Sequence, residues 1–264
     1  MGEMSLLVVD IGNTNVVMGV FTDEKLTGHW RIVTDRDKTE DEYGILISQL
    51  LSRSGINIGG IDSIVISSVV PPLTFTFEEL ARKYFGKEPL TVEPGIRTGI
   101  KILYDNPREV GADRIANAVG AFAKYGSACI VVDFGTATTF DLISSEGDYI
   151  GGVIAPGINI SAEALFKQTS KLPRVDISKP ISIVGKNTVE SIKAGIFYGY
   201  VSLVDGIVDK IKREFGKDLI VIATGGFAKP IAHESDSIDL VDENLTLDGL
   251  RIIYVKNKKN TEEA

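Results

Sequence analysis

The chain has 264 residues and a net charge of −8, with 44% hydrophobic and 24% charged residues, so it is long enough for one large domain or two modest ones. A single cysteine excludes an intramolecular disulfide and a cysteine zinc cluster, and two histidines cannot form a histidine cage around a metal. The negative charge disfavours nonspecific binding to nucleic acid or to an anionic membrane.

The first predicted elements form a meander of three strands over residues 5–10, 16–21 and 26–33. Asp10 interrupts the first apolar stretch and no basic segment precedes it, so we do not expect this segment to be a signal peptide. No apolar run approaches the roughly 18 residues of a membrane span. We therefore expect a cytoplasmic protein.

Helices dominate the segments that follow the meander. Thr39 and Glu42 have the spacing of a capping box, which predicts the start of a helix. The predicted elements are a helix to Gly55, a strand over 62–69, a helix over 71–85, strand and loop over 88–99, and a helix over 107–126.

The pattern at the start of the chain then recurs. Residues 7–12 read Leu-Val-Val-Asp-Ile-Gly, and residues 130–135 read Ile-Val-Val-Asp-Phe-Gly. We therefore expect an internal duplication with two halves, residues 1–115 and 116–264, whose boundary lies inside the helix at 107–126. The second half is predicted to contain strands over 128–133, 140–143 and 149–155, a long helix over 188–215, a strand over 219–223, a short helix, a strand near 238–241 and a last helix from Leu245.

Three predicted strands end in turns of small residues, over 10–15, 133–139 and 224–226. Short side chains leave backbone N–H groups exposed, and such a loop can hold phosphate oxygens. An aspartate beside it suits a hydrated Mg²⁺, which takes one or two carboxylates together with substrate phosphates. One such turn alone is more often a tight hairpin. Two Asp-x-Gly turns at matching positions favour phosphate binding.

Other nucleotide motifs are missing from the sequence, which has neither a G-x-x-x-x-G-K-[ST] loop nor two glycines spaced G-x-G. Instead, four segments resemble type III pantothenate kinases in order and spacing. They are Asp10-Ile11-Gly12-Asn13-Thr14, Gly111-Ala112-Asp113-Arg114, Asp133-Phe134-Gly135-Thr136-Ala137-Thr138-Thr139 and Thr224-Gly225-Gly226. The resemblance covers about residues 5–255. The first segment is shared with sugar kinases, actin and heat-shock ATPases, whereas the second and third are more specific.

The resemblance implies an α/β protein with a duplicated ribonuclease-H-like fold, as in actin-like ATPases. Each half has a mixed sheet flanked by helices, and ATP binds in the cleft between the halves. The implied activity is phosphorylation of the terminal hydroxyl of pantothenate to 4′-phosphopantothenate, the first step of coenzyme A biosynthesis.

The resemblance also implies a set of ATP-binding residues. Asp10 is expected near the Mg-ATP phosphates as the Mg²⁺ ligand. Thr14 and Asn15 are also ordinary turn residues, and both roles can hold together. The implied set is Asp10, Ile11, Gly12, Asn13, Thr14, Asn15, Thr136, Gly225 and Gly226.

Asp113 matches the catalytic base of the family. In a loose phosphoryl-transfer transition state the hydroxyl proton leaves late, so an aspartate can orient the hydroxyl and accept the proton. The alternative is a helix-surface aspartate paired with an arginine. The substrate-binding residues implied are Tyr104, Gly111, Ala112, Asp113, Arg114 and Thr188.

Three of these substrate residues have ordinary structural alternatives. Arg114 suits the pantothenate carboxylate but is equally a candidate for a solvated salt bridge. Tyr104 is otherwise a half-buried aromatic residue. Thr188 lies where a helix N-cap is expected.

The resemblance further implies that Asp133 binds a monovalent cation, K⁺ or NH₄⁺, and that the protein is a homodimer. One long helix carries apolar residues that suit either the dimer interface or the core: Ile196, Phe197, Tyr198, Tyr200, Val201, Val204 and Ile207.

The sequence leaves other functions open. A non-enzymatic transcriptional accessory factor is disfavoured by the charge of −8 and by the lack of a basic recognition motif. An actin-like or heat-shock-like ATPase switch is disfavoured by the small size, and another small-molecule kinase of the same superfamily remains an alternative. We expect neither a nucleic acid nor a membrane partner.

Overall fold

The computed structural model describes the backbone of residues 4–261 and the side chains as far as residue 258. The chain forms two compact units. Unit 1 contains the segments up to residue 100, 105–120 and from residue 245 onward, and unit 2 contains residues 101–104 and 121–244.

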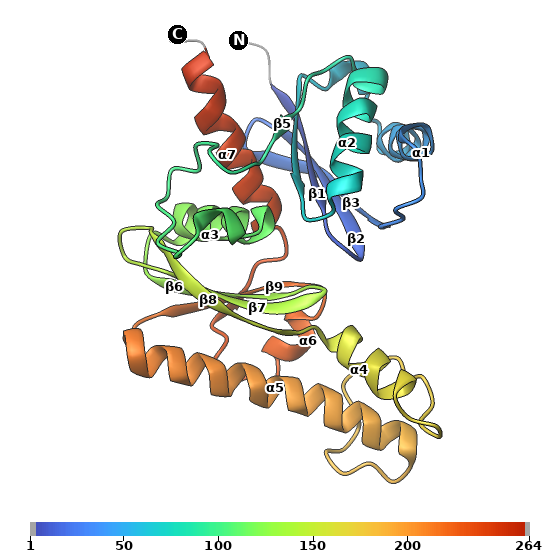
Figure 1. Ribbon diagram of the computed structural model, residues 1–264, viewed down its shortest axis with the longest axis vertical. Coiled ribbons are helices and arrows are strands. Elements are labelled where there is room, and N and C mark those ends of the chain that lie inside the picture. The colour runs from blue at the N-terminus through green and yellow to red at the C-terminus, as the bar shows by residue number, and fades with distance from the viewer. Residues whose placement is uncertain (1–3, 262–264) are drawn as a thin grey trace. The chain divides into compact units, whose positions relative to one another are not determined.

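Unit 1 is built on a five-stranded mixed sheet in the order β3-β2-β1-β4-β5 (Figure 1). The three strands of the predicted meander pair in antiparallel fashion, and β4 and β5 continue the sheet in parallel with β1. The strands are β1 (Ser5–Ile11), β2 (Asn15–Thr22), β3 (Lys25–Val33), β4 (Ser63–Ser68) and β5 (Leu90–Thr91).

Unit 2 repeats this topology strand for strand. Its sheet has the order β10-β9-β6-β7-β8, in which β6, β7 and β8 form an antiparallel meander and β9 and β10 run parallel to β6. The strands are β6 (Cys129–Phe134), β7 (Ala137–Ile143), β8 (Tyr149–Pro156), β9 (Ile220–Gly225) and β10 (Leu240–Val241). The expected duplicated ribonuclease-H-like fold, with mixed sheets flanked by helices, is confirmed.

Helices cover both faces of the unit 1 sheet (Figure 1). On one face α1 (Glu40–Arg53) and α2 (Pro71–Leu80) pack over Leu7, Val9 and Ile11 of β1. The capping box of α1 is confirmed, because the Thr39 side chain accepts from Glu42 N–H and the Glu42 side chain accepts from Thr39 N–H. Short 3₁₀ and π-helical turns also occur, as η1 (Ile58–Gly60) and η2 (Ala81–Phe85).

The helix predicted over 107–126 is in fact two elements. A 3₁₀ turn, η3 (Pro107–Glu109), is followed by Val110 in an extended conformation, and α3 (Ala112–Tyr125) begins after Gly111. The Asn106 side chain caps the first element by accepting from Arg108 N–H at 3.3 Å. The break at Val110 therefore puts Asp113 in the first turn of a helix, where a carboxylate is favoured by the helix dipole.

The last helix, α7 (Leu245–Thr261), belongs to unit 1, unlike its place in the predicted half 116–264. Glycines allow α7 and α3 to approach closely: a Cβ on Gly120 would lie 2.6 Å from the Leu245 carbonyl oxygen, and one on Gly249 would overlap Ala116. Thr246 Oγ1 also donates to Asn117 Oδ1 at 2.7 Å. Packing against β1, β2 and β4 as well as α3, rather than order along the chain, places this helix in unit 1.

In unit 2, α5 (Thr188–Phe215) runs along one face of the sheet, accompanied by α6 (Ala228–Ala232) and α4 (Ile158–Lys167) (Figure 1). No sequence pattern predicted α4. Four of the α5 residues considered for an interface or the core are core residues, with exposed fractions of 7% or less: Phe197, Tyr200, Val201 and Val204. The other three, Ile196, Tyr198 and Ile207, are partly buried against the same core.

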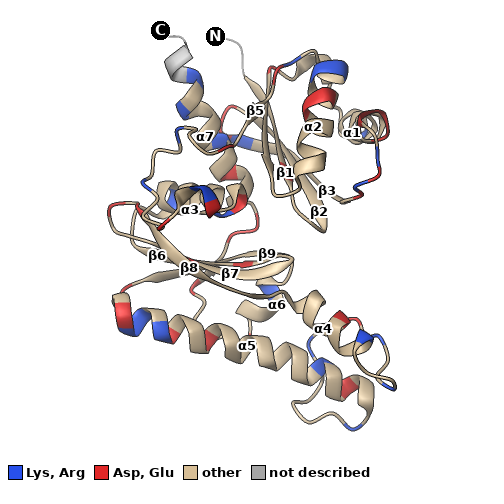
Figure 2. Cartoon of the chain, in the orientation of Figure 1, with Lys and Arg blue, Asp and Glu red and all other residues tan. Residues whose placement is uncertain are grey.

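Charged residues of α5 flank an uncharged stretch, residues 194–204 (Figure 2). Among the described residues, α5 is one helix that is long and apolar enough to cross a membrane, which the sequence analysis did not anticipate. This is weak support for a membrane span, because a helix that packs in a protein core meets the same criteria.

Candidate active site

The first predicted phosphate loop joins β1 to β2 and is braced by the segment after β3. Gly12 N–H donates to the Asn15 carbonyl at 3.0 Å and closes the turn. Thr34 Oγ1 donates to the Gly12 carbonyl at 2.7 Å, and Arg36 Nη2 donates to Asn13 Oδ1 at 2.9 Å. Thr34 and Arg36 were not predicted, because no motif marks residues that reach the loop only through the fold.

Asp10 lies near the carboxyl end of β1 and is half-buried. Its register partner on the parallel strand β4 is Ser67, which is fully buried. Parallel partners present their side chains on the same face of a sheet, so Ser67 shares the face of Asp10. Within the part of the chain that the structure describes, the Ser67 hydroxyl has no hydrogen-bond partner. A buried hydroxyl beside this carboxylate suits a polar ligand at the strand ends.

Asp113 and Arg114 open α3, where Asp113 is half-buried and Arg114 is buried, so Arg114 does not form the solvated salt bridge that was its alternative. Arg114 is only 7% exposed, and its backbone N–H donates to Asp113 Oδ1 at 2.8 Å. Burial raises the pKa of the Asp113 carboxyl, and the Arg114 N–H and guanidinium charge oppose that rise only in part. A Cβ on Gly111 would lie 2.5 Å from Asp113 Oδ1, so the missing side chain at Gly111 leaves room for this carboxylate.

The second loop joins β6 to β7 in unit 2 and contains Thr136, which is half-buried. Gly135 N–H donates to the Ala137 carbonyl at 3.0 Å, the counterpart of the Gly12 hydrogen bond in unit 1. Gly157 N–H donates to the Thr136 carbonyl at 3.1 Å. A Cβ on Gly157 would overlap the Thr136 and Gly135 carbonyls, so this glycine, which the sequence analysis missed, is required beside the loop.

The structure brings Asp133 together with the third small-residue turn. Asp133 pairs with Thr224, and Phe134 with Gly225, across β6 and β9. Gly226 N–H donates to the Phe134 carbonyl at 3.1 Å. Gly225 has a φ of +89°, and a Cβ there would lie 2.6 Å from Asp133 Oδ1. Glycine is therefore favoured at position 225 for two reasons: the backbone is left-handed, and the missing side chain leaves space for the Asp133 carboxylate.

The remaining substrate candidates lie in unit 2. Tyr104 is half-buried, which suits either of its two interpretations, and its ring centroid is 6.3 Å from that of Tyr149. Thr188 is not the N-cap of α5, because Asn187 fills that role by accepting from Glu190 N–H at 2.9 Å. The cap position is thus one residue earlier than the alternative interpretation placed it, and the exposed Thr188 side chain is not used as the cap.

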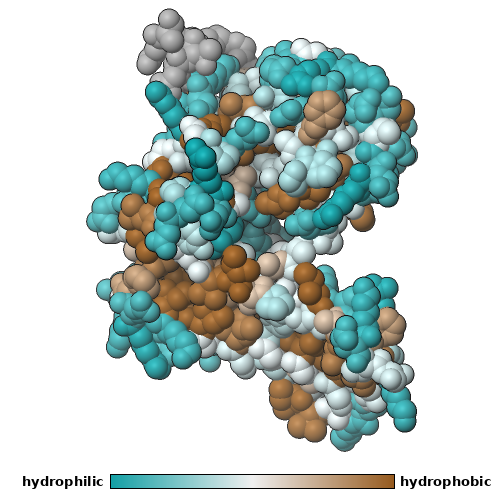
Figure 3. Space-filling view, in the orientation of Figure 1, coloured by the Kyte–Doolittle hydropathy of each residue, from teal (hydrophilic) through white to brown (hydrophobic). Residues whose placement is uncertain are grey.

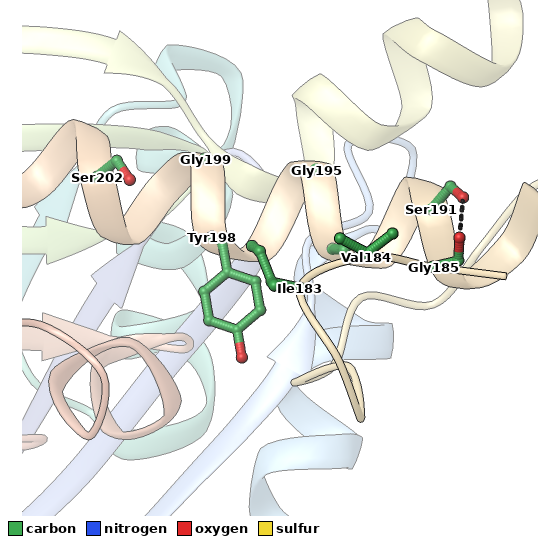
Figure 4. Close-up of a pocket in the computed structure, with 9 residues that line it drawn as sticks. Ile183, Val184, Gly185, Ser191, Gly195, Tyr198, Gly199 and Ser202 are labelled. Atoms are coloured by element: carbon green, nitrogen blue, oxygen red, sulfur yellow. Dashed lines mark hydrogen bonds between the residues drawn. The ribbon is translucent and has the colours of Figure 1, made fainter.

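Two open grooves lie along α5. One, of about 510 Å³, is lined by Ile183, Val184, Gly185 and small residues of α5, and Tyr198 lies at its wall (Figure 4). The other, of about 380 Å³, includes Thr188 with Leu165 and Leu172. Of the predicted site residues only Thr188 lines either groove.

Metal binding by protein side chains alone is not indicated among the described residues, since no group of three or more His, Cys, Asp or Glu side chains could hold an ion. A Mg²⁺ ion bound mainly by nucleotide phosphates needs only one or two protein carboxylates. Asp10, beside a buried hydroxyl, fits that limited role.

Comparisons with solved structures agree with the fold. A Campylobacter jejuni protein described as a Baf family transcriptional activator matches with a TM-score of 0.60 at 22% identity, over 96% of this chain and 99% of that one. MreB 5 of Spiroplasma citri, bound to AMPPNP, matches with a TM-score of 0.55 at 13% identity, over 98% of both chains. At these identities the likeness establishes the fold alone.

Sequence comparisons identify the family as well as the fold. The model of the family described as type III pantothenate kinase matches residues 6–210. A type III pantothenate kinase of Bacillus cytotoxicus is 58% identical over 96% of this chain and 96% of its own length. One of Geotalea uraniireducens is 58% identical over 96% of this chain and 99% of its own. This chain therefore belongs to the type III pantothenate kinase family.

Proposed function

We propose that this protein transfers the γ-phosphoryl group of ATP to the terminal hydroxyl of pantothenate, giving 4′-phosphopantothenate and ADP in the first step of coenzyme A biosynthesis. Its membership of the family, with 58% identity to named pantothenate kinases over nearly the whole chain, carries this proposal. Phosphoryl transfer asks a protein mainly for positioning and for charge stabilisation. The repeated loops and the helical carboxylate are suited to those two tasks.

The two hairpin loops are proposed to bind the nucleotide. The first loop offers the backbone and side chains of residues 11–15, and the second offers Thr136. Their backbones are already fixed by hydrogen bonds at Gly12 and Gly135, so little ordering is left for binding. Gly225 and Gly226 are proposed to approach the nucleotide closely by backbone alone.

Asp113 is proposed as the general base. As the new O–P bond forms and the bond to ADP breaks, the hydroxyl proton passes to an Asp113 carboxylate oxygen. Burial raises the pKa of Asp113, which brings it nearer to the working pH and makes the carboxylate a better proton acceptor. The close Arg114 N–H holds Oδ1 in place.

Pantothenate is proposed to bind beside Asp113. The guanidinium group of Arg114 suits its carboxylate, because an arginine fork pairs with two carboxylate oxygens. Gly111 and Ala112 leave space along the start of α3, while Tyr104 and Thr188 complete the proposed substrate set.

Two ions complete the proposal. Asp10 would hold Mg²⁺, which neutralises phosphate charge when bound. Asp133 would hold K⁺ or NH₄⁺, and the small residues around its carboxylate, Gly135 and Gly225, leave it accessible to an oxygen-coordinated ion. A cytoplasmic location, where ATP is available, belongs to the same proposal.

The decisive assay offers ATP and Mg²⁺ with pantothenate or with a panel of sugars and hydroxy acids, and identifies the phosphorylated product by mass spectrometry. We expect a phosphorylated product with pantothenate and with none of the other acceptors. The rate of pantothenate phosphorylation should be higher with K⁺ or NH₄⁺ than with Na⁺. Phosphorylation of a sugar in preference to pantothenate would contradict the proposal, as would ATP hydrolysis that no acceptor stimulates. An unchanged rate across these cations would remove the role of Asp133 alone.

We also propose a homodimer formed through α5. Apolar side chains next to this helix are exposed, including Ile181 at 100% and Val184 at 71%, and Figure 3 shows hydrophobic surface beside α5. An exposed apolar patch of this kind is typical of an interface. Analytical ultracentrifugation should give twice the chain mass of 28.5 kDa, and Val184→Asp should shift the protein towards the single-chain mass. A wild-type protein that sediments at the single-chain mass would contradict the dimer.

A further inference from the structure

The segment that carries Tyr104 is hydrogen-bonded to β8 at Tyr149. Tyr149 N–H donates to the Lys101 carbonyl at 2.8 Å, and Leu103 N–H donates to the Tyr149 carbonyl at 2.8 Å. Ile102 and Tyr149 thereby form an isolated parallel bridge. Tyr104 follows directly, so the backbone position of Tyr149 determines where Tyr104 leaves the sheet edge.

The ring of Tyr104 rests on the same stretch of β8. It lies at 59° to the Tyr149 ring, with 6.3 Å between the centroids, and a Cβ on Gly151 would lie 3.9 Å from its Cδ2 and Cε2 atoms. β8 is irregular here, because Leu142 pairs with Gly151 and Ile143 with Tyr149, which leaves one extra residue on β8. Such bulges change the direction of the neighbouring side chains and are common beside active sites.

The Tyr149 side chain is itself held by a hydrogen bond to a buried carboxylate. Tyr149 is fully buried, and its hydroxyl donates to Asp141 Oδ1 at 2.7 Å. Asp141, on β7, is also fully buried, and Thr139 Oγ1 donates to its Oδ2 at 3.3 Å. This carboxylate has no role in the proposed reaction. Burying it is also less favourable than burying an apolar side chain of similar size.

We propose that Asp141 and Tyr149 are positioning residues that hold Tyr104 in place to bind pantothenate. This inference rests on the proposed function, in which Tyr104 contacts the substrate. The hydrogen bond from Tyr149 to Asp141 fixes the Tyr149 ring, the ring and its backbone fix the segment 101–104, and Tyr104 then meets the substrate in one orientation. Neither residue touches the substrate itself, so they affect affinity for pantothenate rather than the chemical step.

A double-mutant cycle between Tyr149→Phe and Tyr104→Ala tests this. Tyr149→Phe removes only the hydroxyl that bonds to Asp141. Alone, it should raise the KM for pantothenate about fivefold, because a Tyr104 that is no longer held in one orientation must be ordered when the substrate binds, with kcat and the KM for ATP within about twofold of wild type. In the Tyr104→Ala background the same change should shift the KM for pantothenate by less than about twofold, because the two residues act in series.

The matched control is Tyr254→Phe, which removes another tyrosine hydroxyl bond, from Tyr254 to Ser63 Oγ at 2.5 Å in unit 1. It should lower the melting temperature as Tyr149→Phe does and leave the KM for pantothenate unchanged. Additive KM effects in the cycle, or equal changes in the KM for ATP and for pantothenate, would overturn the positioning role. An unchanged KM for pantothenate in Tyr104→Ala would show that Tyr104 does not contact the substrate, and the positioning role would then fall. A wild-type protein that does not phosphorylate pantothenate would overturn the proposed function as well.

Discussion

Asp113→Asn should lower kcat by about 10²–10⁴-fold, the usual contribution of a general base, with the KM for ATP little changed. The substitution keeps the shape of the side chain and an oxygen that can accept from Arg114 N–H, as Asp113 Oδ1 does at 2.8 Å. It removes only the ability to accept the hydroxyl proton. Steady-state kinetics with pantothenate as the varied substrate measures this effect.

The pH dependence gives a second test of Asp113. Because burial raises its pKa above the ordinary 3.8, the wild-type kcat/KM should fall with decreasing pH through a pKa above that value. The same shift has a stability consequence. The folded state favours the neutral carboxyl, so the free energy of unfolding falls as pH rises from 3.8 to the raised pKa and stays lower above it. Asp113→Asn carries no such cost and should melt at a higher temperature than wild type at pH 7.

Asp209→Asn serves as the control for the same chemical change. Asp209 is 52% exposed on α5 and pairs with Arg213, so its substitution should alter neither kcat nor the pH profile. If Asp113→Asn retained near wild-type kcat while remaining folded by circular dichroism, Asp113 would not be the base.

Gly225→Ala should damage the second half of the site by about 10–100-fold in kcat/KM for ATP, the effect expected when catalytic groups shift by about an ångström. The added methyl group would stand 2.6 Å from Asp133 Oδ1 and 2.7 Å from the Phe134 carbonyl oxygen. The Phe134 carbonyl belongs to the β6 backbone and cannot move alone, so the Asp133 carboxylate and the turn at 224–226 must both shift. Response to K⁺ should weaken in parallel.

Backbone strain alone does not account for the expected loss of activity in Gly225→Ala. Gly55→Ala measures the effect of backbone strain by itself. Gly55 has a similar φ of +75° with nothing within 4 Å of an added Cβ, whereas Gly225 has a φ of +89° in a crowded position. An alanine at a left-handed position costs about 1–2 kcal/mol, so Gly55→Ala should lower stability by that amount and leave kinetics unchanged. If Gly225→Ala behaved in the same way, the contact with Asp133 would have no part in activity.

Local patterns determined most of the secondary structure. Apolar strands ending in aspartate predicted both β1 and β6, and the capping box at Thr39 predicted the start of α1, because strand burial and helix capping depend on neighbours along the chain. The same local patterns failed at residues 107–126. Helical composition continues through that segment, but Val110 adopts an extended conformation, which divides it.

The sequence by itself determined the duplicated strand pattern, the family motifs and the identity of the candidate site residues, since each is written in consecutive residues such as Gly111-Ala112-Asp113-Arg114. Only the tertiary structure decided that α7 packs with unit 1, that Ser67 shares a sheet face with Asp10, and that Tyr149 and Asp141 support the segment of Tyr104. The physical reason is range. Turns and caps are fixed by hydrogen bonds within a few residues, whereas strand register, helix packing at Gly120 and Gly249, and buried polar networks join residues that no local pattern relates.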